Sequence, residues 1–187
     1  LDNSTRLLVG HAQVQDGAYF DDPALRHVIA HSSDVVRALE QVPQVTAAAP
    51  RVVAFALVSA HERSYGAQIM GVDRDAERKL SSLPDMVIAG DYLAQPGAAV
   101  VGSEMARNLG AMLGDELVIL GATREGGVAA LSVRIAGIVD TGTPDLDRAL
   151  VQIRIADFQD AFELDDEVNL VVIRVADFAA VGKVVPN

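Results

Sequence analysis

The sequence predicts an α+β protein built on a mixed β-sheet. Half of the 187 residues are hydrophobic, so the chain can bury a proper core. Aromatic residues make up only 4%, so this core must consist of Val, Leu, Ile and Ala. Strand-like and helix-like segments also alternate along the chain, which indicates one domain or two small intertwined ones.

Composition excludes several classes of function. A formal net charge of −11 argues against nucleic-acid binding and against docking on an anionic membrane surface. The chain has no cysteine, which excludes disulfides, thiolate chemistry and Cys-based zinc sites. No run of 18 uninterrupted apolar residues occurs, so no segment of this sequence is predicted to span a bilayer.

The first elements are a strand and a helix. Alternating apolar residues predict a strand over residues 6–15. A helix with an apolar stripe follows, capped by Ser32 or Ser33 and ended by Pro43; Asp22-Pro23 offers an earlier start.

Two histidines in this region have the spacing of a metal pair on a helix. His27 and His31 lie four residues apart. No Glu lies between them to serve as a general base, and the helix is uncertain there. We therefore predict no metal site.

A long apolar stretch predicts a hairpin. Residues 50–60 are apolar on both faces, which indicates a central, buried strand. Residues 65–73 form the next strand after the short turn "HERS". Asp73 then caps a short helix over "RDAERKL".

The next segment repeats strand, helix and hairpin. Residues 98–101 form a short buried strand, and Ser103 caps a helix that Gly110 ends. "ELVIL" and "VAALSVRIAGIV" are strands joined by the loop "GATREGG". This loop leads into a strand and has no Lys, so it is a hairpin tip and no phosphate-binding loop.

A strand over residues 148–155, a helix over 156–164 and a strand over 165–175 complete the chain. They repeat the strand, helix and strand of the N-terminal part. We therefore expect residues 1–63 and 138–187 to pair into one sheet, with residues 64–137 as an inserted unit.

The tripeptide Asp140-Thr141-Gly142 is the local signature of an aspartic peptidase. Such an enzyme needs two carboxylates that share a proton across one water molecule. The sequence has no second Asp-(Thr/Ser)-Gly, so the second carboxylate would have to come from a twofold partner. The alternative is a turn in which Gly142 has a positive φ and Asp145 and Asp147 stay in water. The spacing of these acids does not match a calcium-binding loop.

No other catalytic constellation emerges. Ser103 in "VVGSEMA" lacks the second Gly of a nucleophile elbow, and a capping role accounts for it. We predict no catalytic residue, no cofactor and no metal ligand.

Taken as a whole, the chain resembles the extracytoplasmic domain of ABC transporter permeases of the MacB/LolC/LolE/FtsX type. The resemblance covers roughly residues 1 to 175 and depends on short blocks in a fixed order. These are "APRV", "GVD", "AGDYL", "VVGSEMARNLGAMLGDELVIL", "VRIAGIVDTGTPDLDRALV" and "VVIRV". In such domains the strand that ends in Gly-Ile leads into a Thr-Gly turn and then an Asp, here Asp147. The family often has Pro where this chain has Arg74.

The resemblance implies a non-catalytic domain between membrane helices, on the periplasmic side of the inner membrane. Residues 1–63 and 138–187 would form a porter-like subdomain of two βαβ units, and residues 64–137 an inserted, sabre-like α+β subdomain. A separate cytoplasmic ATPase would drive the domain by mechanotransmission to export or release a lipoprotein, peptide or similar substrate. The implied partners are a second permease subunit, that ATPase and a periplasmic chaperone or adaptor.

Two alternatives stay open: a homodimeric aspartic-type peptidase that uses Asp140, and a free-standing periplasmic binding or adaptor protein. The sequence on either side of the domain would distinguish a free-standing periplasmic protein from a permease. A permease of this layout has one apolar span of about 20 residues before the domain and three after it.

We expect the isolated domain to be a monomer, because membrane helices would hold the dimer together. Light scattering checks this, and a mass that rises with protein concentration would contradict it.

Overall fold

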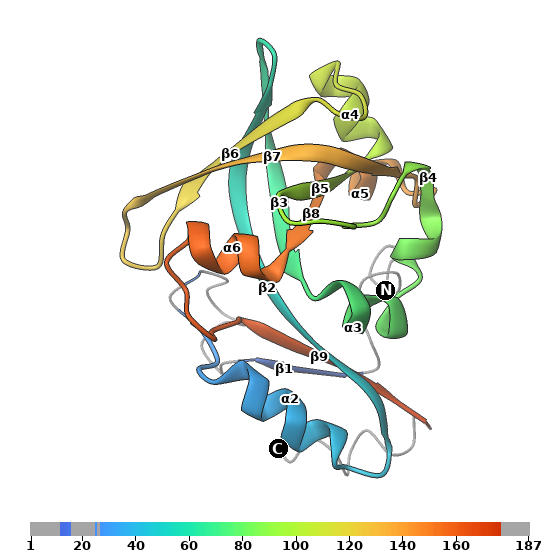
Figure 1. Cartoon of the computed structure of the whole chain (residues 1–187), viewed down its shortest axis with the longest axis vertical. Helices are drawn as coiled ribbons and strands as arrows, with labels where there is room; N and C mark the ends of the chain where they lie inside the picture. The colour runs from blue at the N-terminus through green and yellow to red at the C-terminus, as the bar shows by residue number, and fades with distance from the viewer. Residues whose placement is uncertain (1–11, 16–24, 26, 177–187) are drawn as a thin grey trace.

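The computed structural model describes residues 12–15, 25 and 27–176, and all statements below concern these residues. The predicted α+β class is confirmed: a mixed sheet dominates, with helices packed against it (Figure 1). No helix in this part of the chain is both long and apolar enough to cross a bilayer.

The elements follow the predicted order. The strands are β1 (Ala12–Gln15), β2 (Val45–Ala60), β3 (Arg63–Val72), β4 (Val87–Gly90), β5 (Ala98–Gly102), β6 (Glu116–Ala122), β7 (Val128–Val139), β8 (Leu150–Arg154) and β9 (Leu170–Val175). The helices are α2 (Ser32–Glu40), α3 (Arg74–Leu80), the 3₁₀ turn η1 (Leu83–Met86), α4 (Ser103–Leu109), α5 (Pro144–Ala149) and α6 (Ile155–Ala161).

Six strands form a closed ring of backbone pairing. Its order is β2, β3, β8, β5, β7 and β6, and β6 pairs again with β2. One buried cluster receives side chains from every strand of the ring: Val58, Ile69, Val101, Ile119, Ile135 and Ile153. Met105 of α4 and the stacked rings of Phe158 and Phe162 belong to the same cluster. The ring is therefore a filled core.

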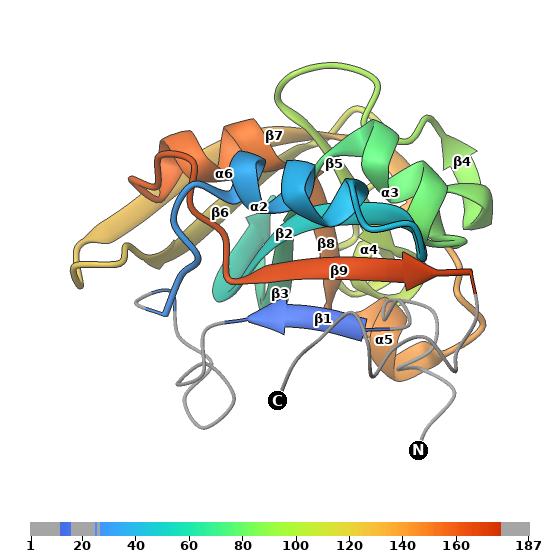
Figure 2. The ribbon, with the colours of Figure 1, turned by 90° about the horizontal axis from the view of Figure 1, so that it is seen from below.

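The remaining strands form a smaller lobe with the first half of β2. β9 lies between β1 and β2 and is antiparallel to both, as Figure 2 shows for β1 and β9. α2 covers the face of this sheet that carries Ala48 and Val171. α3 covers the face that carries Ala49 and Val172 through Leu80.

β2 belongs to both lobes and changes partner along its length. It pairs with β9 up to Arg51 and with β6 from Leu57. Between these points the side-chain amide of Asn169 takes the place of a neighbouring strand. It accepts a hydrogen bond from the Val53 N–H at 2.9 Å and donates one to the Val53 carbonyl at 2.7 Å.

A buried ion pair fixes α3 to β2 beside this point. Arg51 donates two hydrogen bonds to the Glu77 carboxylate, at 2.9 and 2.6 Å, and both residues are almost fully buried. The Ser81 hydroxyl donates to the same carboxylate at 2.6 Å. This bidentate geometry offsets the cost of removing both charges from water.

Several local predictions are confirmed. β2 and β3 form a hairpin, and so do β6 and β7 with the loop "GATREGG" between them. The Asp73 carboxylate accepts hydrogen bonds from the N–H groups of Asp75 and Ala76 at the start of α3. Gly110 ends α4 with a φ of 67°. Residues 6–11 of the first predicted strand and the earlier helix start at Asp22-Pro23 lie outside the described residues.

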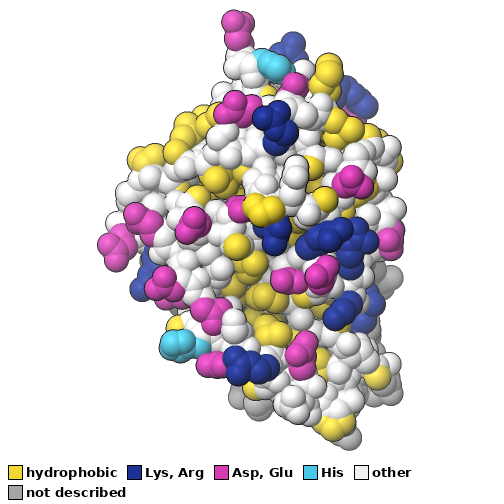
Figure 3. All heavy atoms as spheres, in the orientation of Figure 1, with side chains coloured by type: hydrophobic (Ala, Val, Ile, Leu, Met, Phe, Trp, Pro, Cys, Tyr) yellow, Lys and Arg dark blue, Asp and Glu magenta, His cyan; other side chains and the backbone are white. Residues whose placement is uncertain are grey.

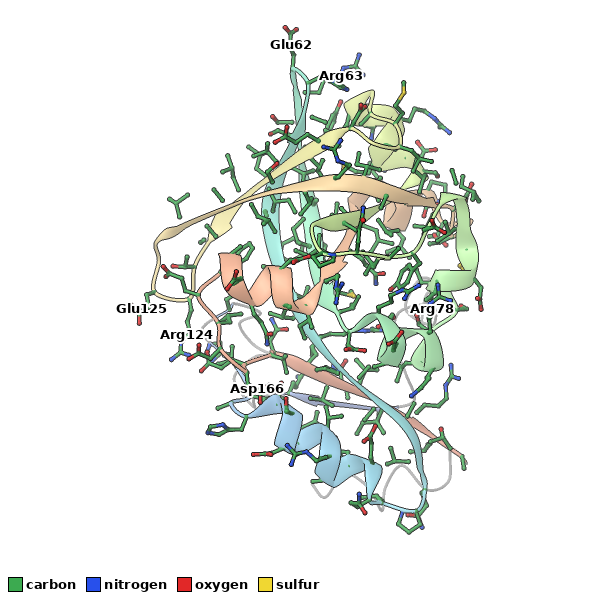
Figure 4. All side chains as sticks on the ribbon, in the orientation of Figure 1. Glu62, Arg63, Arg78, Arg124, Glu125 and Asp166 are labelled. Atoms are coloured by element: carbon green, nitrogen blue, oxygen red, sulfur yellow. The ribbon has the colours of Figure 1, made fainter. Side chains whose placement is uncertain are left out.

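Two predicted caps and one predicted burial are wrong. The side chains of Ser32 and Ser33 do not cap α2; both donate to the Asp166 carboxylate, which also accepts the Ser33 N–H. Figure 4 labels Asp166 beside α2. Ser103 is the first residue of α4 and makes no capping bond, because Gly102 occupies the cap position. β2 is buried on both faces only in its first half, since Phe55 and Leu57 are 70% and 44% exposed.

The division at residues 64–137 stays a prediction. The sheet runs across both of its boundaries: β8, from the second outer segment, lies between β3 and β5. β2 likewise ends before residue 64 and pairs with β3 and β6.

The variant Arg51→Met should lower the free energy of unfolding by about 3–5 kcal/mol, because it leaves the Glu77 carboxylate buried without its cation. Urea titration of the isolated domain measures this. The double variant Arg51→Met/Glu77→Leu should recover most of the loss. Arg37→Met, which breaks an exposed pair with Asp34, is the control and should cost under about 0.5 kcal/mol. A single-variant loss below about 1 kcal/mol would contradict the assignment.

Candidate functional site

The peptidase-like tripeptide forms a turn between β7 and α5. The Asp140 carboxylate accepts a hydrogen bond from the Gly142 N–H at 2.9 Å, and Gly142 has a φ of 72°. Thr141 donates its N–H and its hydroxyl to Asp147, at 3.1 and 2.8 Å. The turn prediction is confirmed in this respect.

Asp147 differs from the prediction that it stays in water, because it is only 2% exposed. Burial raises the pKa of its carboxyl, and the hydrogen bonds from Thr141 oppose that rise. The backbone of Asp147 also lies against Gly102: a Cβ on Gly102 would meet the Asp147 carbonyl oxygen at 2.1 Å. Asp147 therefore joins the turn, α5 and the end of β5.

Asp140 and Asp147 thus come near each other as structural acceptors. Each takes its hydrogen bonds from the turn that it closes. A peptidase dyad requires two carboxylates that face one water molecule and share a proton. The tripeptide in this chain supplies turn geometry, and the observed bonds give no support to the peptidase alternative.

Other polar groups that sequence reasoning left open are also structural. His31 precedes α2 in a left-handed conformation, so His27 and His31 do not share a helix. Within the described residues, no group of three or more His, Cys, Asp or Glu side chains is placed to hold a metal ion. The loop "GATREGG" is anchored by an ion pair between Arg124 and Glu167 at 2.5 Å. The adjoining hollow is lined by Arg124, Glu125, Glu163, Asp165 and Glu167.

A second polar network lies beneath the segment that follows η1. The Tyr92 hydroxyl donates to the Gln152 side chain at 2.7 Å, and both groups are buried. Burial raises the pKa of Tyr92 well above its ordinary value, so the hydroxyl stays a donor. Sequence reasoning missed this pair and the Arg51–Glu77 pair, since nothing in the local pattern joins residues so far apart.

The two lobes are joined at the place where β2 changes its neighbouring strand from β9 to β6. We call Arg51, Val53 and Asn169 the branch point. It joins the lobe that holds the first and last described strands to the closed ring. These bonds and the continuous backbone of β2 connect the two lobes directly.

Comparison with known proteins shows which family this chain belongs to. A family described as the MacB-like periplasmic core domain matches residues 2–186. The chain belongs to this family. It is a periplasmic domain of the kind found in MacB- and LolE-like ABC transporter permeases.

Two solved structures show the same fold at low sequence identity. The extracellular domain of the noncanonic ABC-type transporter YknZ, from Gram-positive bacteria, superposes with a TM-score of 0.65 at 14% identity, over 92% of this chain and 88% of that one. The periplasmic region of MacB from Actinobacillus actinomycetemcomitans gives 0.62 at 12% identity, over 88% and 73%.

A curated relative is the lipoprotein-releasing system transmembrane protein LolE of Haemophilus influenzae. It is 28% identical over 115 residues, which are 60% of this chain and 27% of that protein. The match thus spans about a quarter of the length of this relative.

Asp147 should make the free energy of unfolding depend on pH. The pKa of Asp147 is raised in the fold, so the fold is stabilised when this carboxyl is protonated. This stabilisation is fully present below the ordinary Asp pKa of about 3.9 and is lost as pH rises through the pKa of Asp147 in the folded protein. Asp147→Asn keeps an acceptor for Thr141 and should remove this loss, so its stability relative to the wild type rises with pH. Unfolding curves across the acid range measure it.

Asp147→Ala should cost about 1–3 kcal/mol in acid, because the Thr141 N–H loses its acceptor, and the cost should shrink as pH rises and Asp147 ionises in the wild type. Asp145→Asn is the control, since the Asp145 side chain is 91% exposed. A pH dependence that is equal in the wild type and Asp147→Asn would contradict the role of this carboxyl.

Proposed function

We propose that this domain transmits conformational change within an ABC transporter permease, from a cytoplasmic ATPase to a substrate on the outer side of the cytoplasmic membrane. The domain carries no chemistry of its own in this proposal. Its relatives are transporter domains, and every buried side-chain nitrogen and oxygen in the described part of the chain has a hydrogen-bond partner.

The observation that carries the proposal is the continuity of β2. Sixteen residues run without interruption from the β9 lobe into the closed ring. The β9 lobe also holds this strand laterally, by the Arg51–Glu77 pair and by Asn169. Membrane helices that flank the domain would attach to the β1–β9 lobe, and β2 would carry their movement into the ring.

The substrate and partners follow from the relatives. LolE is named for lipoprotein release, so a lipoprotein, peptide or similar molecule already outside the membrane is the substrate class that we infer. A second permease subunit and an ATPase would complete the transporter, and a periplasmic chaperone or adaptor would receive the substrate.

The variant Asn169→Leu in the full-length transporter tests force transmission. It removes both bonds to Val53 while keeping similar volume, so movement of one lobe should no longer reach the other in full. Transport should fall by about five- to tenfold with little change in ATP hydrolysis, the size of a typical coupling between sites.

Asn108→Leu is the matched control, because the Asn108 side chain is partly exposed in α4, away from the branch point. Urea unfolding of both isolated domains separates loss of fold from loss of coupling. Should Asn169→Leu destabilise the fold, Asn169→Ala also removes both bonds and leaves space in which water can reach the Val53 N–H and carbonyl. Unchanged transport in a folded Asn169 variant with broken bonds would count against the lever.

A further inference from the structure

A hollow of about 210 Å³ lies between α3 and α6. β3 and β8 are parallel neighbours, with Val72 opposite Arg154, and each strand leads into one of these helices at the same edge of the sheet. Arg74 of α3 and Arg154 at the end of β8 therefore line one hollow, together with Ala94 from the segment after η1. Drug-sized ligands occupy pockets of about 300–1,000 Å³, so this volume suits a smaller group.

Arg154 differs from the other arginines of the described residues. Each of the others donates a hydrogen bond to the protein, except Arg78, whose guanidinium lies 5.9 Å from the centre of the Tyr92 ring. The partly buried side chain of Arg154 does neither within this part of the chain. Every fully buried side-chain nitrogen there has a partner, so the nitrogens of Arg154 are open to a solute. A guanidinium has five N–H donors, and all five are available here.

Arg74 brings a second guanidinium to the hollow. Its Nε donates to the Tyr92 carbonyl at 3.0 Å, which holds the side chain and leaves its terminal nitrogens unbonded within the described residues. Arg78, labelled in Figure 4, lies on the next turn of α3. Figure 3 shows Lys and Arg side chains gathered across the middle of the molecule, between α6 and α3. This area is basic on a chain whose net charge is −11.

Two carboxylates also border the hollow, and neither forms an ion pair with Arg74 or Arg154 within the described residues. The Asp73 carboxylate accepts hydrogen bonds from the N–H groups of Asp75 and Ala76, at 3.0 and 2.8 Å. The Asp75 side chain is exposed. These acids repel a multiply charged anion, and so does the net charge of −11. The hollow therefore favours a ligand group with a single negative charge.

We propose that this hollow binds a carboxylate, with Arg74 and Arg154 donating hydrogen bonds to its oxygens. A carboxylate carries one negative charge and matches the planar fork of a guanidinium. A phosphate monoester carries nearly two charges at neutral pH, which the bordering acids disfavour. The carboxylate belongs to a small organic acid or to the C-terminus of a peptide, since both present the same group. This binding does not depend on the proposed function.

A carboxylate held in the hollow bridges the two lobes. Arg74 belongs to α3, whose Leu80 packs on the β9 lobe. Arg154 leads into α6, whose Phe158 fills the core of the closed ring. The ligand meets both arginines only in the folded arrangement, so it should raise the melting temperature of the domain.

NMR of the arginine side chains tests the site directly in the 187-residue chain. The Nε–H signals of an isotope-labelled sample are followed while sodium acetate replaces sodium chloride at constant ionic strength. The signals of Arg74 and Arg154 should shift and saturate. The dissociation constant should be on the order of 1 mM, which is within the limit for a ligand of four non-hydrogen atoms.

Triglycine and triglycine amide distinguish the two sources of the carboxylate. Tighter binding of triglycine than of acetate assigns the site to a peptide C-terminus, and equal or weaker binding assigns it to a small acid. The amide has no carboxylate and should shift neither signal. An equal shift with the amide would contradict recognition of the carboxylate.

Arg154→Gln should weaken acetate binding about tenfold, the factor expected for one lost charge-assisted hydrogen bond. Its urea midpoint should equal that of the wild type, because the Arg154 side chain makes no bond to the described part of the protein. Arg148→Gln is the matched control and should bind acetate normally, since Arg148 pairs with Asp145 on α5, outside the hollow.

The proposal would be overturned if Arg154 showed no saturable shift with acetate roughly tenfold above that dissociation constant. An equal shift at Arg148 would overturn it too, since acetate would then act only through the general ion atmosphere. Unchanged binding in Arg154→Gln would be a third contradiction. None of these measurements requires transport, so failure of the carboxylate site is distinct from failure of force transmission in the Asn169 variants.

Discussion

The structure depends on a single strand that keeps its backbone hydrogen bonds while it changes neighbours. β2 leaves β9 at Arg51 and meets β6 at Leu57, and a buried backbone cannot leave its polar groups unpaired in between. The Asn169 amide presents a carbonyl oxygen and an N–H side by side, as a peptide group does, and these pair with the Val53 N–H and carbonyl. This substitution of a side chain for a strand pairs the Val53 backbone at the place where one sheet divides into two lobes.

The need to pair every buried polar group with a hydrogen-bond partner also explains the other buried polar residues. Arg51 and Glu77 neutralise each other, and the Tyr92 hydroxyl donates to Gln152. The Asp147 carboxylate accepts a hydrogen bond from the Thr141 hydroxyl. Among the described residues, no buried side-chain nitrogen or oxygen lacks a hydrogen-bond partner. Fully satisfied networks of this kind give a fixed arrangement rather than a reactive one.

Local rules predicted the elements whose signals are local. The Asp73 cap, the Gly110 end of α4 and both hairpins each depend on a few adjacent residues, and the structure confirms them. Predictions failed where a distant segment decided the outcome. Asp166 accepts the bonds of Ser32 and Ser33 from more than a hundred residues away.

The exposed face of β2 shows the same limit in another form. An apolar run such as "PRVVAFALVSA" predicts burial on both sides, and its first half conforms because α3 and the β9 lobe cover it. Hydrophobicity alone could not show that this cover ends before Phe55. Nor could it show that the buried carboxyl beside the Asp-Thr-Gly turn would be Asp147, since the sequence carries no sign of how α5 folds back onto Gly102.

The closed ring also constrains how the chain is made. β3 and β5 are each paired with β8, which lies about 50 or more residues later in the sequence. During synthesis β3 and β5 therefore leave the ribosome with an unpaired edge. Neither edge can pair with β8 until the chain has been synthesised through Arg154 and has left the ribosome. The ring of the nascent domain therefore stays open to pairing with other extended chains until this late strand of five residues closes it.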